Sequence, residues 1–204
     1  IIRLDAFAYL HKEPGQPNFF NRPGTWEYLM RLRCKAQKYN LVIFPEIHSE
    51  YRDGIQEEIA REGYQIYDFF IPGLVIDALD RGRNEALLQW ITDIRINNLQ
   101  TINMLPTHEG NPEKGLKGIL DGGTYRPGHH SHEQIEETVQ RIIDRGGLTK
   151  NLNDANGKKI LSSQVIATFF SALGEDEQKL RLARAIQMFM PGVPQVGDLD
   201  LFDG

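Results

Sequence analysis

The chain is poor in the features that mark several protein classes. It has one cysteine among 204 residues, so no internal disulfide can form. Its apolar runs are far shorter than the roughly 20 residues that a membrane-spanning helix needs, and we find no signal peptide. These absences favour a reducing, cytoplasmic compartment. We expect the single cysteine, Cys34, to pack within a helix.

A strong excess of charge is lacking too. With 23 Lys and Arg against 28 Asp and Glu, the net charge is −5 at pH 7. That balance argues against nucleic acid or an anionic membrane as a main partner. No Gly-rich phosphate loop follows any apolar run, which disfavours a nucleotide-binding sheet. The 40% hydrophobic content is that of a globular domain with one sizeable core.

What the chain does have is an alternation of short apolar runs and helix-like segments. The expected strands cover 1–6, 41–44, 67–71, 101–105 and 194–199. The expected helices cover 25–38, 55–62, 74–79, 84–97, 131–145, 164–173 and 176–190. Irregular stretches cover 12–24, 109–131 and 150–159. Alternating strands and helices predict an α/β fold with a parallel sheet, either doubly wound or part of a barrel.

The first residue already lies inside an expected strand. A buried strand rarely starts at a native N-terminus, so we expect the chain to be a piece of a longer protein.

Three acidic residues follow expected strands: Asp5, Glu46 and Glu109. The carboxyl ends of parallel barrel strands converge on one face, so these carboxylates are expected to meet. A pair of carboxylates is the usual machinery for glycosidic bonds, where one attacks the sugar and the other protonates the leaving oxygen.

The residues around these acids support the same chemistry. Arg3 and Asp5 are two apart on a strand and therefore share a face, where the guanidinium can keep the carboxylate ionised. Glu46 ends an apolar run, so we expect burial to raise its pKa, which suits a general acid. His108 precedes Glu109, and such a pair can bind a sugar hydroxyl and stabilise positive charge.

Six blocks together resemble the sucrose phosphorylases and sucrose 6′-phosphate phosphorylases of the α-amylase superfamily. They are RLDAFAY, PEIH, YDFFIPGLVIDAL, INMLPTHEG, SQVIATFFSALGEDE and ARAIQMFMPGVPQV, and LDLF near the end leans toward the 6′-phosphate branch. The resemblance covers nearly the whole chain. It implies a (β/α)8 TIM barrel of which residues 1–204 form the C-terminal part, the fourth to eighth strands, as one partial catalytic domain with no second domain.

The resemblance also implies the roles of the catalytic residues. Asp5 would be the nucleophile, Arg3 its orienting partner and Glu46 the acid/base. His108 and Glu109 would stand where the family has a pair that stabilises the transition state. The implied reaction is retaining α-glucosyl transfer from sucrose or sucrose 6′-phosphate to inorganic phosphate, which releases α-glucose 1-phosphate.

Two further positions line the acceptor side in the family, and they match Tyr9 and Gln164. The family needs neither a metal nor an organic cofactor. The chain departs from the family pattern at three places, which are Glu109 where the family has aspartate, Ser163 where it has an aromatic residue, and Gly197–Asp198 where it has an aromatic pair.

Alternatives remain open. One is a related α-glucoside hydrolase or a glucosylglycerate-type phosphorylase, and another is a catalytically silent partial barrel with a structural or assembly role. Metal binding by His129, His130 and His132 is a weaker alternative, because no nearby acid or cysteine completes a ligand set. An open barrel edge also predicts self-association.

Overall fold

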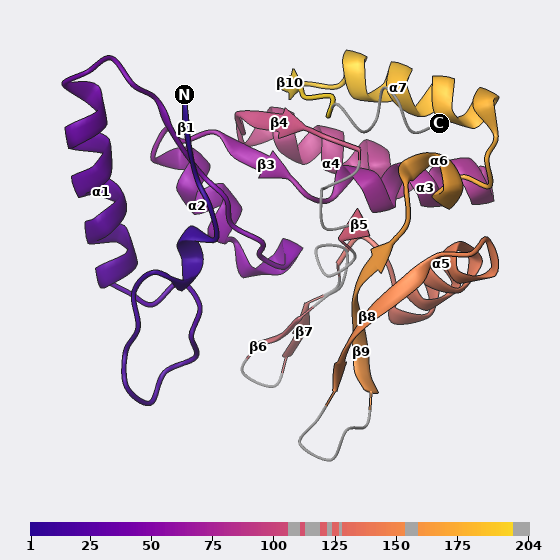
Figure 1. Ribbon diagram of the computed structural model, residues 1–204, viewed down its shortest axis with the longest axis horizontal. Helices are drawn as coiled ribbons and strands as arrows, with labels where there is room; N and C mark the ends of the chain where they lie inside the picture. The colour runs from indigo at the N-terminus through magenta and orange to yellow at the C-terminus, as the bar shows by residue number, and fades with distance from the viewer. Residues whose placement is uncertain (106–110, 113–118, 122–123, 127, 154–158, 198–204) are drawn as a thin grey trace.

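The structure, a computed structural model, describes residues 1–105, 111–112, 119–121, 124–126, 128–153 and 159–197 (Figure 1). The helices are α1 (Gly24–Gln37), α2 (Ile55–Arg61), α3 (Ile71–Arg81), α4 (Glu85–Ile96), α5 (His132–Asp144), α6 (Phe169–Ala172) and α7 (Glu177–Phe189), with short 3-10 turns η1 (Phe7–Tyr9) and η2 (Tyr51–Asp53). The strands are β1 (Ile2–Leu4), β2 (Ile43–Pro45), β3 (Ile66–Asp68), β4 (Thr101–Asn103), β5 (Asn111–Pro112), β6 (Ile119–Asp121), β7 (Thr124–Arg126), β8 (Leu148–Asn153), β9 (Lys159–Ile166) and β10 (Val193–Pro194).

Five of the strands pair in parallel, which confirms the predicted α/β class. β1 pairs with β2, and β4 pairs with β3 on one side and β10 on the other. Within the described residues no ladder joins β2 to β3. The Phe44 and Tyr67 rings, with centroids 4.2 Å apart, make the contact there instead. The barrel is therefore not closed in this chain, and β1 pairs only with β2 among the described strands.

The helix α3 shows how the sequence sets an element boundary. The Asp68 side chain, at the end of β3, accepts hydrogen bonds from the backbone N–H groups of Phe70 and Ile71, each 3.1 Å long. These are donors that the first turn of a helix leaves unpaired. Pro72 follows in that first turn, where its missing N–H costs nothing. Gly82, with φ of 65°, ends the helix.

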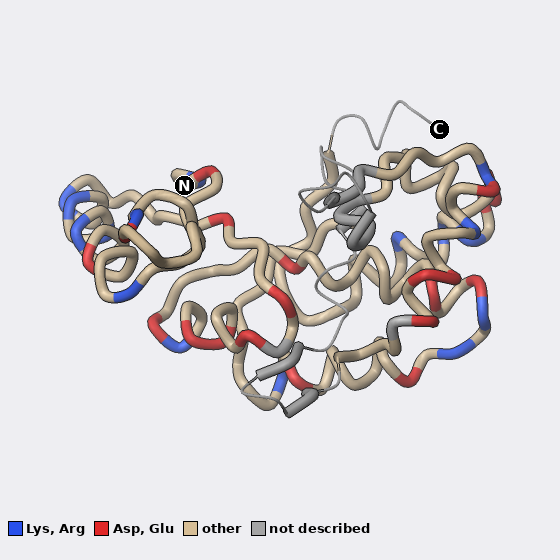
Figure 2. Tube along the Cα trace, turned by 90° about the horizontal axis from the view of Figure 1, so that it is seen from below, with Lys and Arg blue, Asp and Glu red and all other residues tan. Residues whose placement is uncertain are grey.

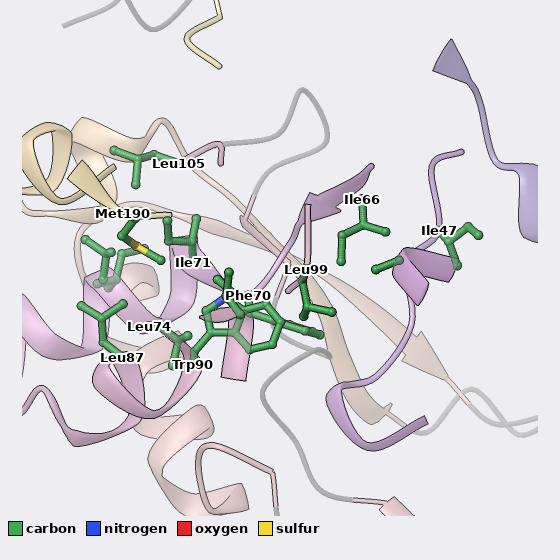
Figure 3. Packing of buried hydrophobic residues seen from close by; sticks show 14 of the residues in the cluster. Ile47, Ile66, Phe70, Ile71, Leu74, Leu87, Trp90, Leu99, Leu105 and Met190 are labelled. Carbon is green, nitrogen blue, oxygen red and sulfur yellow. The ribbon is translucent and has the colours of Figure 1, made fainter. Parts of the chain in front are cut away.

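The main core lies between the strands and the layer of α3 and α4 (Figure 3). Trp90 of α4 is 1% exposed, meets Phe70 edge-on at 4.8 Å and donates from Nε1 to Asp68 over 2.8 Å. A second, smaller cluster contains Phe44, Tyr67, Phe69, Ile102 and Met104. Tyr67 and Phe69 belong to this cluster, whereas Phe70, at the start of α3, belongs to the main core.

Several expectations about local structure were wrong. Residues 164–166 continue β9, which is antiparallel to β8, and the helix α6 starts only at Phe169. A short apolar run does not distinguish a strand from a helix by periodicity alone. The strand expected over 67–71 ends at Asp68, because the Asp68 side chain starts α3. The irregular stretch 109–131 contains the short strands β5, β6 and β7, and the stretch 150–159 contains the end of β8 and the first residue of β9. Within the described residues, the strand expected over 194–199 is limited to β10.

Charged residues are distributed unevenly over the molecule. Figure 2 shows Lys and Arg gathered at the end that carries α1, and mixed charges around α5 and α7. Cys34 on α1 is exposed, so the expectation that it packs was wrong. Among the described helices, none combines the length and the apolar character needed to cross a membrane.

Candidate active site

Two carboxylates and one guanidinium meet where β1 and β2 end. Arg3 Nη2 lies 3.0 Å from Asp5 Oδ1 and 2.7 Å from Glu46 Oε2. Since one nitrogen contacts both carboxylates, the two acids lie together at the carboxyl ends of paired strands. The expectation that Arg3 and Asp5 share a face is confirmed. The second contact of Arg3, to Glu46, is a feature that the sequence did not predict.

The backbone turns sharply after Asp5 and supplies another donor. The Glu46 N–H donates to the Leu4 carbonyl over 3.0 Å, which extends the pairing of β1 and β2 by one step. Ala6 then adopts φ 46° and ψ 35°, a left-handed conformation that few residues other than glycine occupy. The Ala6 N–H donates to Glu46 Oε2 over 3.2 Å. The strained turn thus helps to hold the Glu46 carboxylate.

The Glu46 carboxyl stays ionised from neutral pH down to strongly acidic pH. Its side chain is 9% exposed, and burial by itself raises the pKa of a carboxyl group. Hydrogen bonds from His48, Arg3 and the Ala6 N–H, together with the Arg3 charge, outweigh burial and lower the pKa of Glu46 to about 2. The expectation of a raised pKa was therefore wrong for this unliganded arrangement, because the strand end that buries the carboxyl also surrounds it with donors.

The two carboxylates have different surroundings. The Asp5 side chain is 73% exposed, so a ligand can reach it, whereas Glu46 is enclosed. Burial lowers the pKa of Arg3, but the hydrogen bond and charge of Glu46, with smaller contributions from Tyr67 and Asp5, give a net rise. The Arg3 guanidinium also lies 5.8 Å from the centre of the Tyr67 ring. Arg3 stays charged and ties the exposed acid to the enclosed one.

His48 is the site residue to which sequence reasoning assigned no role. Its Nε2 lies 3.3 Å from Glu46 Oε1, and its ring stacks on Phe69 with centroids 3.7 Å apart and an interplanar angle of 24°. The signal was present in the sequence. Glu46 and His48 are two residues apart in an extended segment, so their side chains point to the same side.

The other predicted site residues are not brought to this cluster within the described structure. Tyr9 lies in η1, is 47% exposed and meets Phe19 edge-on at 5.5 Å. Gln164 lies in β9, paired with Lys150 of β8 and Pro112 of β5. His108 and Glu109 lie outside the described residues.

Two of the three histidines considered for a metal have other contacts, and the side chain of the third, His132, lies outside what the structure describes. His130 Nε2 lies 2.8 Å from Asp77 Oδ2. The His129 ring lies 3.8 Å from the Tyr51 ring between centroids. No group of three or more His, Cys, Asp or Glu suited to a metal ion occurs in the part of the chain that the structure describes.

The fold and the site define an α/β protein with paired carboxylates at the carboxyl ends of parallel strands. The sucrose 6(F)-phosphate phosphorylase of Ilumatobacter coccineus is 53% identical over 204 residues, all of this chain and 38% of that protein. The sucrose phosphorylase of Bifidobacterium adolescentis is 37% identical over 201 residues, 96% of this chain and 38% of that protein. No family model matches the chain.

A solved structure agrees with these relatives. The crystal structure of sucrose 6F-phosphate phosphorylase from Thermoanaerobacter thermosaccharolyticum superposes with a TM-score of 0.81 at 31% identity, over 99% of this chain and 39% of that one. The chain is a partial homologue of the sucrose and sucrose 6F-phosphate phosphorylases and belongs to that family. It spans about 38% of the length of the curated relatives named above.

Proposed function

We propose that residues 1–204 supply the catalytic carboxylates of a retaining α-glucosyl phosphorylase. The donor would be sucrose or sucrose 6′-phosphate and the acceptor inorganic phosphate. The observation that carries the proposal is the single Arg3 nitrogen shared by Asp5 and Glu46. Two oxygens bound to one nitrogen cannot lie farther apart than the sum of their distances to it. That limit is compatible with the carboxyl separation of about 5–5.5 Å expected of retaining enzymes.

The chemistry divides between the two acids. Asp5, exposed and oriented by Arg3, attacks the anomeric carbon while Glu46 gives a proton to the departing fructosyl oxygen. The glucosyl group is then held as a β-linked ester on Asp5. Phosphate attacks the same carbon, Glu46 takes up its proton, and the Asp5 ester bond breaks. The two inversions release α-glucose 1-phosphate with net retention.

Glu46 needs a proton for the first step and must lose it for the second. With three donors around it, the carboxyl is held as the carboxylate, the form that accepts the proton of phosphate. The acid step therefore requires that at least one donor withdraws when the sugar binds. Such a change would bring the pKa of Glu46 closer to working pH.

The remaining roles rest on the family resemblance. His108 and Glu109 would stabilise the transition state, and Tyr9 and Gln164 would line the acceptor side. Glu109 is one methylene longer than the aspartate of the family, which displaces its carboxylate by roughly 1 Å and can cost about a hundredfold in rate. We propose that the reaction needs neither a metal nor an organic cofactor.

A second candidate is a catalytically silent partial barrel. It is favoured by the exposure at β1, where Ile2 is 41% exposed and Ile1, just before the strand, is 82% exposed. An exposed strand edge is a template for another strand, so we propose self-association along β1. Light scattering tests this, and a monodisperse monomer across the working concentration range contradicts it. A related hydrolase or a glucosylglycerate-type phosphorylase is the remaining alternative, and a cytoplasmic location is likewise a proposal.

The deciding experiment is incubation of the folded chain with sucrose or sucrose 6′-phosphate and inorganic phosphate, with an assay for α-glucose 1-phosphate. We expect product with the chain and none with Asp5→Asn. Glucose without glucose 1-phosphate would favour the hydrolase. No turnover from a folded, monodisperse chain would favour the silent barrel.

A further inference from the structure

The donors around Glu46 come from two directions. From the β1 side, Arg3 and the Ala6 N–H both reach Oε2, at 2.7 and 3.2 Å. From the other side, His48 reaches Oε1 at 3.3 Å, and within the described residues it is the donor at that oxygen. A carboxylate only accepts, so the hydrogen in this contact belongs to Nε2 of His48. Within the described residues, the hydrogen bond at Oε1 therefore depends on the His48 imidazole.

Packing rather than a polar network holds the imidazole in place. The ring lies nearly parallel to that of Phe69, which is 3% exposed and part of the interior cluster. The His48 side chain itself is 34% exposed, so it is not locked inside the core. A ring that is supported on one flat face and open to solvent elsewhere can move without disturbing the core. Arg3 and Ala6 lack this freedom, since Ala6 donates from the backbone and Arg3 also holds Asp5.

We propose that His48, supported by Phe69, is a positioning residue that fixes Oε1 of Glu46 and governs whether this carboxyl carries a proton. While Nε2–H donates, Glu46 is a carboxylate and can act as a base. When a ligand takes the hydrogen bond of His48, Oε1 loses its donor and the carboxyl takes up a proton from solvent. The catalytic consequence rests on the proposed function, whereas the control of protonation is a property of the unliganded chain.

Other charged or titratable groups face Glu46 and must be held constant in a test. Arg3 faces it from β1 and also contacts Asp5, and Tyr67 faces it from β3. Burial raises the pKa of Tyr67, and Arg3 opposes that rise. A change at His48 replaces none of these groups, whereas Phe69 lies 5.5 Å from the Tyr67 ring between centroids, so Phe69→Leu also changes a contact of Tyr67.

The experiment is a pH titration of the chain without substrate, with the Glu46 carboxyl observed by carbon-13 NMR. His48→Phe keeps an aromatic ring on Phe69 and removes the donor, and we expect the pKa of Glu46 to rise by about one unit or more. His48→Gln restores an N–H donor and should recover part of the shift. Phe69→Leu keeps an apolar side chain without the flat support and should give a smaller rise.

The chain offers a matched control. His11 Nε2 lies 2.6 Å from Glu13 Oε1, again a histidine and a glutamate two residues apart, at a distance from β2 along the chain. His11→Phe should leave the titration of Glu46 unchanged. Tryptophan fluorescence confirms that each variant keeps its fold.

An unchanged or lowered pKa of Glu46 in folded His48→Phe would overturn the proposal. This readout separates it from the proposed function. If the chain makes no glucose 1-phosphate but the titration shifts as expected, the positioning role stands and the phosphorylase activity fails. If the chain is active and the titration does not shift, the reverse holds.

Discussion

The region around β1, which carries the candidate site, and the region around α3 differ in burial and in how their charged side chains are paired. In β1 the residues Ile2 and Arg3 are exposed, while β3 and β4 are buried throughout. At the site, one guanidinium holds both acids. On the α3 side, by contrast, the Asp80 side chain is 2% exposed and is bound by Arg145 of the α5 C-cap at 2.8 Å and Lys179 of α7 at 2.9 Å. The candidate site thus lies on the less covered part of the described structure, where Asp5 is open to a ligand.

Two buried carboxylates at neighbouring strand ends, one in each region, differ in the direction of their pKa shift. Glu46 and Asp68 each accept three hydrogen bonds. The donors of Glu46 include a guanidinium, and its pKa falls to about 2. Asp68 is fully buried, its donors are all neutral, and burial raises its pKa to about 6. For Asp68 burial outweighs the three neutral donors, whereas for Glu46 the hydrogen bonds from His48, Arg3 and Ala6, together with the Arg3 charge, outweigh burial.

The largest effect on stability is expected in the main core beside α3 and α4. Trp90→Ala should lower the free energy of unfolding by about 3–5 kcal/mol, because it empties a buried aromatic position and removes a hydrogen bond from buried Asp68. Urea unfolding measures the change. Ile96→Ala on the same helix is the control, since Ile96 is 75% exposed and should change stability by less than about 0.5 kcal/mol. Equal losses in both variants would contradict the assignment of the core to this side.

The raised pKa of Asp68 predicts a pH dependence of stability. In the folded chain this carboxyl keeps its proton up to about pH 6, so folding takes up a proton. Its stabilising contribution is present below its unfolded pKa and is lost as the pH rises through about 6, by roughly 2–3 kcal/mol in total.

Asp68→Asn isolates this contribution. The variant should be less stable overall, because an amide nitrogen would meet one of the donors now bound to Asp68, but its stability should lack the fall between about pH 4 and 6. Urea unfolding at several pH values measures both. Asp144→Asn, at an exposed acid that accepts from Gln140, should keep the wild-type dependence. If the free energy of unfolding depended on pH in the same way in Asp68→Asn and in wild type, the pKa of Asp68 would not be raised in the folded chain.

A smaller loss is expected from the ionic contacts of α3. Asp80→Asn leaves Arg145 and Lys179 facing each other without their shared carboxylate, and should cost about 2 kcal/mol. The matched control is Glu177→Gln, which breaks the exposed pair with Arg181 at 3.2 Å and should cost less than about 0.5 kcal/mol. Chemical denaturation compares the two, and similar losses would mean that burial of Asp80 adds nothing.

The sequence predicted the parts of the fold that follow from local chemistry. The parallel strands and most helices are found near the expected positions, and the helix expected from residue 131 begins there, with reciprocal capping contacts between Ser131 and Gln134. The hairpin of β8 and β9 was not predicted, because its pairing depends on contacts between segments rather than on either segment alone.

For the site, the sequence predicted that Arg3 and Asp5 meet, because strand alternation fixes it. It did not predict the direction of the Glu46 shift. Burial and donors act on the carboxyl in opposite directions, and their balance depends on the positions of His48, Arg3 and the Ala6 N–H, which only the three-dimensional structure provides. The placement of His108 and Glu109 remains a prediction.

The smallest expected effect on stability falls on the residue with the largest proposed role. Asp5→Asn removes one of the two partners of Arg3, but Asp5 is 73% exposed and Arg3 keeps Glu46. The free energy of unfolding should therefore change by less than about 0.5 kcal/mol, while formation of glucose 1-phosphate disappears. Paired unfolding and activity measurements on one preparation test both statements. A loss of activity that came with a large loss of stability would mean that this edge holds the fold together, and the contrast with the α3 side would then be wrong.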